Sequence, residues 1–140
     1  MKLTTKGRYA VMAMADLAVN ENLKPISLNE ISVRQNISLS YLEQLFLKLK
    51  NNRLVKSVRG PHGGYVLEKK PKDIKLSSII FAVNEEVKSL NCKKNSKKGC
   101  GGRSVKCITH NLWDDLEKHI NSFFESKNLN ELVSKQENIF

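Results

Sequence analysis

Residues 27–67 contain the pattern that most restricts how this chain can fold. The spacing of Ser27 and Glu30 matches a capping box, in which the side chain of each residue bonds a backbone amide of the other. This box predicts a helix over 28–36, and a second, amphipathic helix is expected over 39–51 after a tight turn. Two short helices joined in this way are typical of a helix-turn-helix.

Two short runs of β-forming residues follow the second helix directly. They cover residues 54–58 and 65–67, and the turn between them has the sequence Arg-Gly-Pro-His-Gly-Gly. Glycine and proline between two apolar runs predict a hairpin, here long enough to project as a wing. A helix-turn-helix followed by such a hairpin is a winged helix. The chain is therefore predicted to be mainly α with a small β-hairpin wing, an α+β arrangement.

Apolar residues at helical spacing predict which side chains each helix buries. A first helix is expected over 4–20, and a short helix over 77–83 is expected to pack under the winged helix. The expected inward residues are Tyr9, Met12, Ala13 and Leu17 of the first helix; Leu28, Ile31 and Val33 of the helix over 28–36; Leu39, Leu42, Leu45, Phe46 and Leu49 of the helix over 39–51; and Ile79, Ile80 and Val83 of the helix over 77–83.

The helix over 39–51 has an outward face that suits contact with DNA. The N-terminal part of a recognition helix reaches base edges in the major groove. There Gln44 can pair with adenine, and Glu43 can accept a hydrogen bond from cytosine. Arg59, at the base of the wing turn, could enter a minor groove. The alternative is an exposed face without a partner and an arginine that contacts phosphate or nothing. The outward residues are Ser40, Tyr41, Glu43, Gln44 and Lys48.

The balance of charge favours a nucleic acid as partner. The chain has 24 Lys and Arg against 14 Asp and Glu, a net charge of +10, and residues 1–75 alone carry +8. Release of counterions from phosphates drives the binding of such a basic surface. Because the positive charge coincides with the predicted winged helix, double-stranded DNA is the expected partner.

Residues 92–110 hold all three cysteines of the chain, Cys92, Cys100 and Cys107, followed by His110. Thiolates and an imidazole on a Gly-rich loop are suitable ligands for a metal or an iron–sulfur cluster. Structural zinc also accepts three Cys and one His, although its ligands usually come in pairs two to four residues apart. Here only Cys107 and His110 are that close. The residues alone leave both cofactors open.

The helix predicted over 111–126 has a wide apolar face that needs a partner. We expect it to pack on a second copy of the chain, since two-fold dimers are the commonest oligomers. Packing back on its own winged helix is the alternative. A last short helix is expected over 128–135. The apolar residues are Leu112, Leu116, Ile120 and Phe123, widened by Trp113 and Phe124.

Three parts are therefore expected along the chain: a winged-helix DNA-binding domain over 1–84, a cluster-binding loop over 85–110, and a dimerisation helix with a C-terminal helix over 111–140. No stretch approaches the ~20 apolar residues of a membrane span. The chain is expected in the cytoplasm, where cysteines are more often ligands than disulfides. Because there is no catalytic constellation, neither an enzyme nor a small-molecule substrate is expected. An electron carrier would not need a basic winged helix.

Three stretches resemble the Rrf family of bacterial winged-helix regulators: LTTKGRYAVMAMADLA, ISLSYLEQLFLKLKNNRLVKSVRGPHGGY and CITH. The similarity runs nearly end to end. The position of a His three residues after the last Cys resembles the pattern of the branch of this family that binds a 2Fe–2S cluster. This resemblance implies a homodimer that represses the genes of iron–sulfur cluster assembly. The implied cluster ligands are Cys92, Cys100, Cys107 and His110, and the implied DNA contacts are Ser38, Ser40, Tyr41, Glu43, Gln44, Arg59, Gly60 and Pro61.

Two features depart from the family pattern. Seven residues separate the first two cysteines and six separate the next two, a slightly longer spacing than is expected of this branch. The longer spacing bears on cluster stability more than on ligand identity. His62 stands where the family wing usually has glycine, which alters the fit of the wing to a groove.

Occupancy of the cluster is hypothesised to tune DNA binding. Residues 88–107 carry seven basic side chains and no acidic one, a field that would stabilise an anionic cluster and could also bind DNA. Cluster binding would order the loop beside the helix over 111–126 and change how two recognition helices fit DNA. Glu43 is the candidate for the residue whose energetic cost on DNA binding depends on whether the cluster is bound. A zinc-stabilised or cluster-independent repressor is the alternative.

Overall fold

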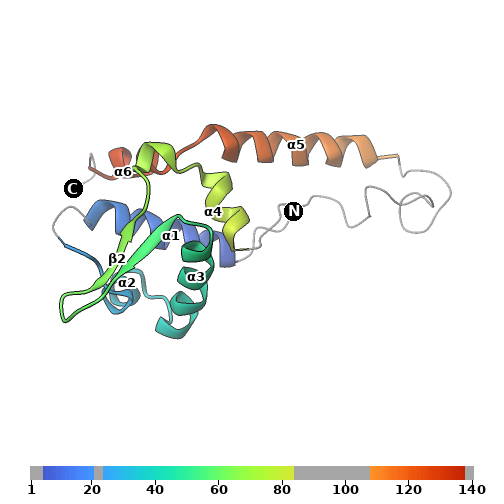
Figure 1. Ribbon diagram of the computed structural model, residues 1–140. Helices are drawn as coiled ribbons and strands as arrows, with labels where there is room; N and C mark the ends of the chain where they lie inside the picture. Colours follow the sequence, from blue (N-terminus) through green and yellow to red (C-terminus); the bar gives the residue numbers. More distant parts are fainter. Residues whose placement is uncertain (1–4, 21–23, 84–107, 138–140) are drawn as a thin grey trace.

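A computed structural model of the chain describes residues 5–20, 24–83 and 108–137 (Figure 1). Its elements, in order, are α1 (Thr5–Asn20), α2 (Leu28–Gln35), α3 (Leu39–Asn51), β1 (Val55–Val58), β2 (Gly64–Leu67), the 3-10 helix η1 (Pro71–Asp73), α4 (Leu76–Ala82), α5 (His110–Ser126) and α6 (Leu129–Glu137). The predicted mainly α fold with a hairpin is confirmed. Each predicted helix and strand is present, with ends that differ by one or two residues.

Side chains at both ends of the turn between α2 and α3 fix the helix-turn-helix. The Ser27 amide donates to Glu30 Oε2 (2.9 Å) and the Glu30 amide donates to Ser27 Oγ (3.2 Å), so the capping box is formed. The hydrogen bond from the Ser27 amide lowers the pKa of Glu30. Asn36 ends α2 in the left-handed conformation (φ 55°), and Ser38 Oγ accepts from the Tyr41 amide (3.4 Å) at the start of α3. Local hydrogen bonds therefore set this motif.

The wing, β1 and β2, is an antiparallel hairpin that is attached to the helices on two sides. The Ile26 N–H donates to Tyr65 O (3.0 Å) and the Tyr65 N–H donates to Ile26 O (2.7 Å), an isolated bridge that joins the segment before α2 to β2. Gly64 permits this approach, because a Cβ at that position would overlap the backbone of Ile26. The Tyr65 ring also packs edge-on against Phe46 of α3, with ring centroids 5.0 Å apart. The base of the wing is thus held against α3.

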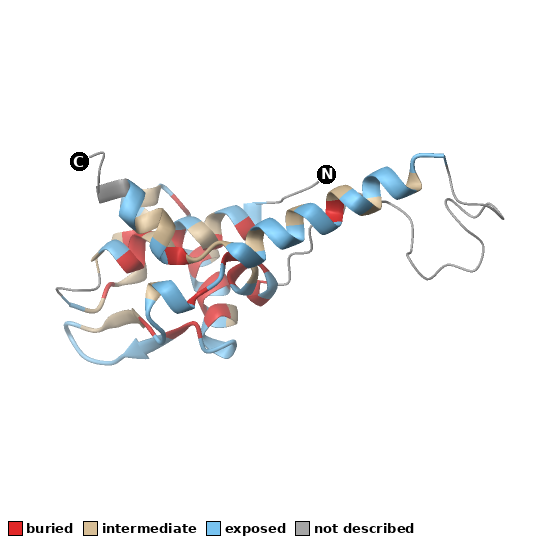
Figure 2. Ribbon diagram, turned by 90° about the horizontal axis from the view of Figure 1, so that it is seen from above, coloured by how far each residue is buried: buried red, intermediate tan, exposed pale blue. Residues whose placement is uncertain are grey.

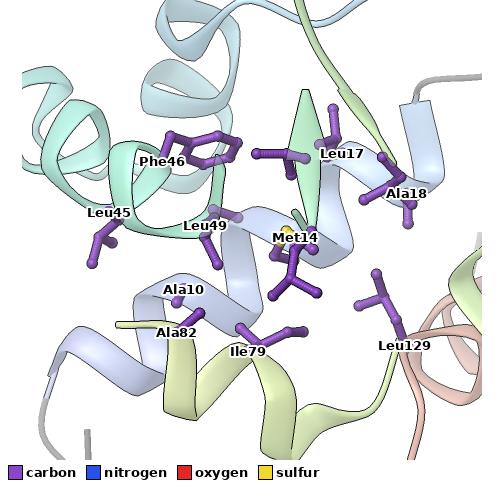
Figure 3. Packing of buried hydrophobic residues seen from close by; sticks show 14 of the residues in the cluster. Ala10, Met14, Leu17, Ala18, Leu45, Phe46, Leu49, Ile79, Ala82 and Leu129 are labelled. Carbon is purple, nitrogen blue, oxygen red and sulfur yellow. The ribbon is translucent and has the colours of Figure 1, made fainter. Parts of the chain in front are cut away.

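α1 is the central helix of the core and packs against α2, α3, α4, α6 and β2. Figure 3 shows Met14 and Leu17 of α1 near Phe46 and Leu49 of α3, with Ile79 of α4 on the other side. All but one of the residues predicted to be buried in the helices over 39–51 and 77–83 are buried, and the exception is Leu39. The confirmed residues are Leu42, Leu45, Phe46, Leu49, Ile79, Ile80 and Val83.

Three residues predicted to point inward are exposed instead: Met12, Val33 and Leu39. Two side chains that are two residues apart in a helix point in directions about 200° apart around its axis. Met12 therefore lies opposite buried Met14, and Val33 lies opposite Ile31, which is the one buried residue of α2. Leu39 is the first residue of α3 and lies beyond the edge of the core. The predictions for Met12 and Val33 were wrong because each was assigned to the buried stripe of a helix whose opposite face it occupies.

α6 returns the chain to the winged helix after α5. Leu129 is fully buried in the core. The Leu76 N–H donates to Lys127 O (3.0 Å) and the Leu129 N–H donates to Ile74 O (2.9 Å), joining the end of α5 to the start of α4. α5 itself packs mainly on α4 and extends away from the other helices (Figures 1 and 2). Among the described residues, no helix is long and apolar enough to span a membrane.

Candidate DNA-binding surface

α3 presents a polar face opposite its buried stripe. Ser40, Glu43 and Gln44 are exposed and lie three or four residues apart, which places them on the same side of the helix. Ser40 Oγ lies 3.0 Å from the capping hydroxyl of Ser38, which is also exposed. The Glu43 carboxylate offers acceptors, and the Gln44 amide offers donors and an acceptor, matching the groups on base edges in the major groove.

Two residues of α3 that were predicted to face outward, Tyr41 and Lys48, are half-buried instead. Tyr41 packs on a neighbouring helix. Its ring packs edge-on against Tyr9 of α1, with ring centroids 5.9 Å apart and an angle of 86° between the planes. Part of this side chain therefore joins the start of α3 to α1. The hydroxyl end of a tyrosine so placed remains the part suited to a phosphate or base contact.

The tip of the wing carries the other predicted contacts. Arg59, Gly60, Pro61 and His62 are all exposed. The Gly63 N–H donates to Gly60 O (2.9 Å) and closes the turn, with Gly60 at φ +122°, a conformation that side chains other than glycine rarely adopt. The tight turn places Arg59 at the end of β1. In Figure 1 the wing tip and the start of α3 lie along the lower edge of the molecule, whereas α5 runs along the opposite edge.

Exposed basic residues follow the polar face of α3 along the chain. Lys50, Arg53 and Lys56 are exposed between the last turn of α3 and β1. Positive side chains arranged around a polar face attract phosphates without selecting a sequence. This arrangement suits a protein whose base contacts come from α3 and whose backbone contacts come from the surrounding lysines and arginines.

A buried carboxylate that sequence reasoning missed positions the helix-turn-helix. Asp16 of α1 is 5% exposed. Its Oδ1 accepts a hydrogen bond from Arg34 Nη2 (2.8 Å), and its Oδ2 accepts one from Arg34 Nε (3.0 Å). Gln35 Nε2 donates to Asp16 Oδ2 as well (2.8 Å). The hydrogen bonds to Asp16 raise the pKa of Arg34. They fasten the last turn of α2 to α1, directly before the turn that leads to α3.

Of the four predicted cluster ligands, one lies within the described residues. His110 is half-buried and is the first residue of α5. Cys92, Cys100 and Cys107 lie outside the described residues. Residues 5–20, 24–83 and 108–137 contain no group of three or more His, Cys, Asp or Glu side chains that could hold a metal ion. Three thiolates and one imidazole are a donor set that suits a 2Fe–2S cluster, and the assignment stays a prediction.

α5 exposes apolar side chains along much of its length. Leu112 is 60% exposed and Phe123 is 52% exposed, at the two ends of the predicted apolar stripe, and Trp113 is exposed beside it. The end of α5 is fastened to α4 through Glu125, which accepts from Lys75 Nζ (2.7 Å) and Ser77 Oγ (2.8 Å). These contacts lower the pKa of Glu125. The helix is thus anchored at one end, and its apolar face is exposed at Leu112, Trp113 and Phe123. The rest of the predicted face, Leu116, Ile120 and Phe124, is half-buried, and Phe124 packs against the core.

The helix-turn-helix, the hairpin wing and the net charge of +10 together define a winged-helix DNA-binding protein. The chain belongs to the Rrf2 family, whose model, described as "Iron-dependent Transcriptional regulator", matches residues 3–135. The predicted family and the predicted role as a DNA-binding transcriptional regulator are confirmed. The family and its relatives are regulators rather than enzymes, as predicted.

Two curated relatives show the extent of the similarity. The chain is 51% identical over 137 residues to the HTH-type transcriptional regulator IscR of Photorhabdus laumondii, covering 98% of this chain and 82% of the relative. It is 52% identical over 138 residues to a putative HTH-type transcriptional regulator of Haemophilus influenzae, covering 97% of this chain and 89% of the relative.

Solved structures share the fold over nearly the whole chain. T. potens IscR superposes with a TM-score of 0.79 at 36% identity, covering 99% of this chain and 90% of that one. CymR, the global cysteine regulator of B. subtilis, also has a TM-score of 0.79, at 32% identity, covering 96% of this chain and 98% of that one. The similarity therefore extends through α5 and α6 as well as the winged helix.

Proposed function

We propose that this regulator acts as a homodimer in the cytoplasm and represses genes of iron–sulfur cluster assembly, with cluster occupancy tuning its choice of DNA site. The observation that carries the proposal is the exposed polar face of α3 beside the wing, connected through α4 to a helix that begins at His110. The relatives named IscR and the iron-dependent description of the family support it.

Contact with DNA is assigned to two elements in this proposal. On α3, Glu43 and Gln44 would contact base edges in the major groove, while Ser40 and Tyr41 contribute hydroxyl groups and Ser38 holds the helix start in place. On the wing, the Arg59 guanidinium would enter the neighbouring minor groove, with Gly60 and Pro61 setting the turn that presents it.

Cys92, Cys100, Cys107 and His110 would hold the 2Fe–2S cluster. When bound, such a cluster supplies a redox-active, oxygen-sensitive group whose presence reports iron and oxidant levels. Because His110 starts α5, ligation by its imidazole would fix the N-terminal end of a helix whose other end is already fastened to α4 through Glu125. A change in the ligand state of His110 would therefore bear on the orientation of α5.

The apolar face of α5 is the proposed dimer interface. Leu112 and Phe123 are more than half exposed in the single chain, and burial of aromatic and aliphatic side chains drives stable association. A symmetric pair of α5 helices would set the distance between the two copies of α3. Since operators for two-fold dimers have half-sites about one or more helical turns apart, that distance decides which sites fit.

Two measurements test this proposal. Protein purified without oxygen should absorb visible light as a brown species with two irons per subunit, whereas a colourless, zinc-loaded protein would favour the zinc-stabilised alternative. The protein should also enrich a defined duplex from a random library, and Gln44→Ala should weaken binding to that duplex about tenfold. Asn29→Ala, at an exposed polar position of α2, should leave the affinity unchanged. Failure of the wild-type protein to enrich any sequence would refute the proposed function.

A further inference from the structure

The exposed face of α3 carries a large apolar side chain among its polar residues. Leu47 is 59% exposed, whereas Leu42, Leu45 and Leu49 of the same helix are buried. The core of this chain therefore gains little from Leu47. Single exposed leucines are common on protein surfaces, and what distinguishes Leu47 is its position on the helix.

Leu47 lies on the same side of α3 as the proposed base contacts. It follows Gln44 by three residues, Glu43 by four and Ser40 by seven, and each of these separations brings side chains to one face of a helix. All four residues are exposed. The face that is proposed to enter the major groove thus consists of a hydroxyl, a carboxylate, an amide and, one turn further on, an isobutyl group.

The major groove offers few partners to an isobutyl group. Base edges there present hydrogen-bond donors and acceptors, and the apolar exception is the C5 methyl group of thymine. Contact between two apolar surfaces removes both from water, which favours binding. Resting on the proposed function, we propose that Leu47 is a specificity-determining residue that contacts the C5 methyl group of a thymine in the operator.

The geometry of the helix limits where this thymine lies. Four helical residues rise about 6 Å, and successive bases on one strand are about 3.4 Å apart. The thymine contacted by Leu47 therefore lies within about two base pairs of the base contacted by Glu43, in each half-site. This apolar contact would select a thymine at a position that the hydrogen-bonding residues of α3 do not read.

Replacement of thymine by deoxyuridine tests the contact, because it removes the methyl group and leaves base pairing intact. The probe is a duplex that the full chain selects from a random unmodified library, with each thymine replaced in turn. At one position per half-site, deoxyuridine should weaken wild-type binding about fourfold, the effect of one buried methyl group. Leu47→Ala should bind the thymine duplex about as weakly and show no further loss with deoxyuridine at that position.

Control variants separate this contact from other roles of Leu47. Val33→Ala removes an aliphatic side chain that is 75% exposed on α2, and it should keep the fourfold effect, as should Leu47→Met. A deoxyuridine series that is flat, or whose effect persists in Leu47→Ala, would overturn the inference while leaving the proposed function standing. Dissociation of the Leu47→Ala dimer in sedimentation would also overturn it, because Leu47 would then contact a second copy. If the wild-type protein selects no sequence, the proposed function itself fails.

Discussion

Asp16 illustrates how one buried charge positions the DNA-binding motif. Its carboxylate accepts hydrogen bonds from Arg34 and Gln35, so the end of α2 cannot rotate about α1 without losing them. A buried carboxylate that loses a charged partner is costly, because the neutral donors that remain, Gln35 and Asn20, do not compensate its charge. The pair therefore contributes to the orientation of the turn before α3 as well as to stability.

Arg34→Met should lower the free energy of unfolding by about 2 kcal/mol, because Asp16 would stay buried with fewer donors. Urea denaturation of the purified protein measures this change. The matched control is Lys118→Met, which breaks the exposed Lys118–Asp114 pair of α5 (3.0 Å) and should leave the denaturation midpoint unchanged. Equal effects of the two substitutions would contradict a positioning role for Asp16.

Glu30 makes the stability of the helix-turn-helix depend on pH. Its pKa is lowered in the folded chain, chiefly by the hydrogen bond from the Ser27 amide. A depressed folded pKa stabilises the fold above the pKa of the unfolded chain, and that contribution is lost as the pH falls through the folded value. Between about pH 5 and about pH 3, wild-type protein should thus lose more stability than Glu30→Gln. Parallel pH curves for the two proteins in thermal denaturation would rule out this contribution.

Interactions between close neighbours in the sequence were predictable and distant ones were not. Ser27 and Glu30 are three residues apart and form the expected capping box, because its geometry depends on one helical turn. Asp16 and Arg34 are 18 residues apart, and no periodicity rule pairs them. The one available signal was an acidic residue inside an otherwise apolar part of the first helix.

The wing depends on a segment that has no strand signal of its own. Ile26 pairs with Tyr65 through two backbone hydrogen bonds, and one residue is too short for alternation to predict a strand. The helices and the hairpin could be predicted because caps, apolar stripes and a Gly/Pro turn mark them. The pairing before α2 depends instead on the close approach of two backbones at Gly64.

Gly64→Ala should detach the base of the wing and lower the free energy of unfolding by about 3 kcal/mol, because the new Cβ meets the backbone of Ile26. Gly60→Ala is the matched control, since a Cβ there meets nothing within 4 Å and only the backbone conformation (φ +122°) is strained. It should cost about 1 kcal/mol. Calorimetry measures the free energy of unfolding of both variants. A larger loss of stability in Gly60→Ala than in Gly64→Ala would contradict the role given to Gly64.

The exposed apolar residues of α5 bear on the proposed assembly of two copies of the chain. Its stripe was predictable from apolar spacing, and residues such as Leu112 and Phe123 are exposed in the single chain. What covers that stripe could not be derived from periodicity, which describes one helix and not its partner. Three of the four predicted cluster ligands lie outside the described residues, and the ligand set stays a prediction.

Leu112→Glu should convert the dimer to monomer, since a charge would replace an exposed leucine of the proposed interface. Sedimentation velocity at micromolar concentration reports the change. Asn121→Glu introduces the same charge at an exposed polar position of α5 and should remain dimeric. Wild-type protein that sediments as a monomer would remove α5 as an interface.

The most direct test of cluster-tuned DNA binding compares the anaerobic wild-type protein with Cys92→Ala on the duplexes that each selects from a random library. Fluorescence anisotropy at fixed salt should give affinities that differ between the two proteins by about 5- to 150-fold on at least one class of site, the range of a coupling of about 1–3 kcal/mol. The same affinity for both proteins on every selected duplex would contradict a regulator whose winged helix responds to the cluster.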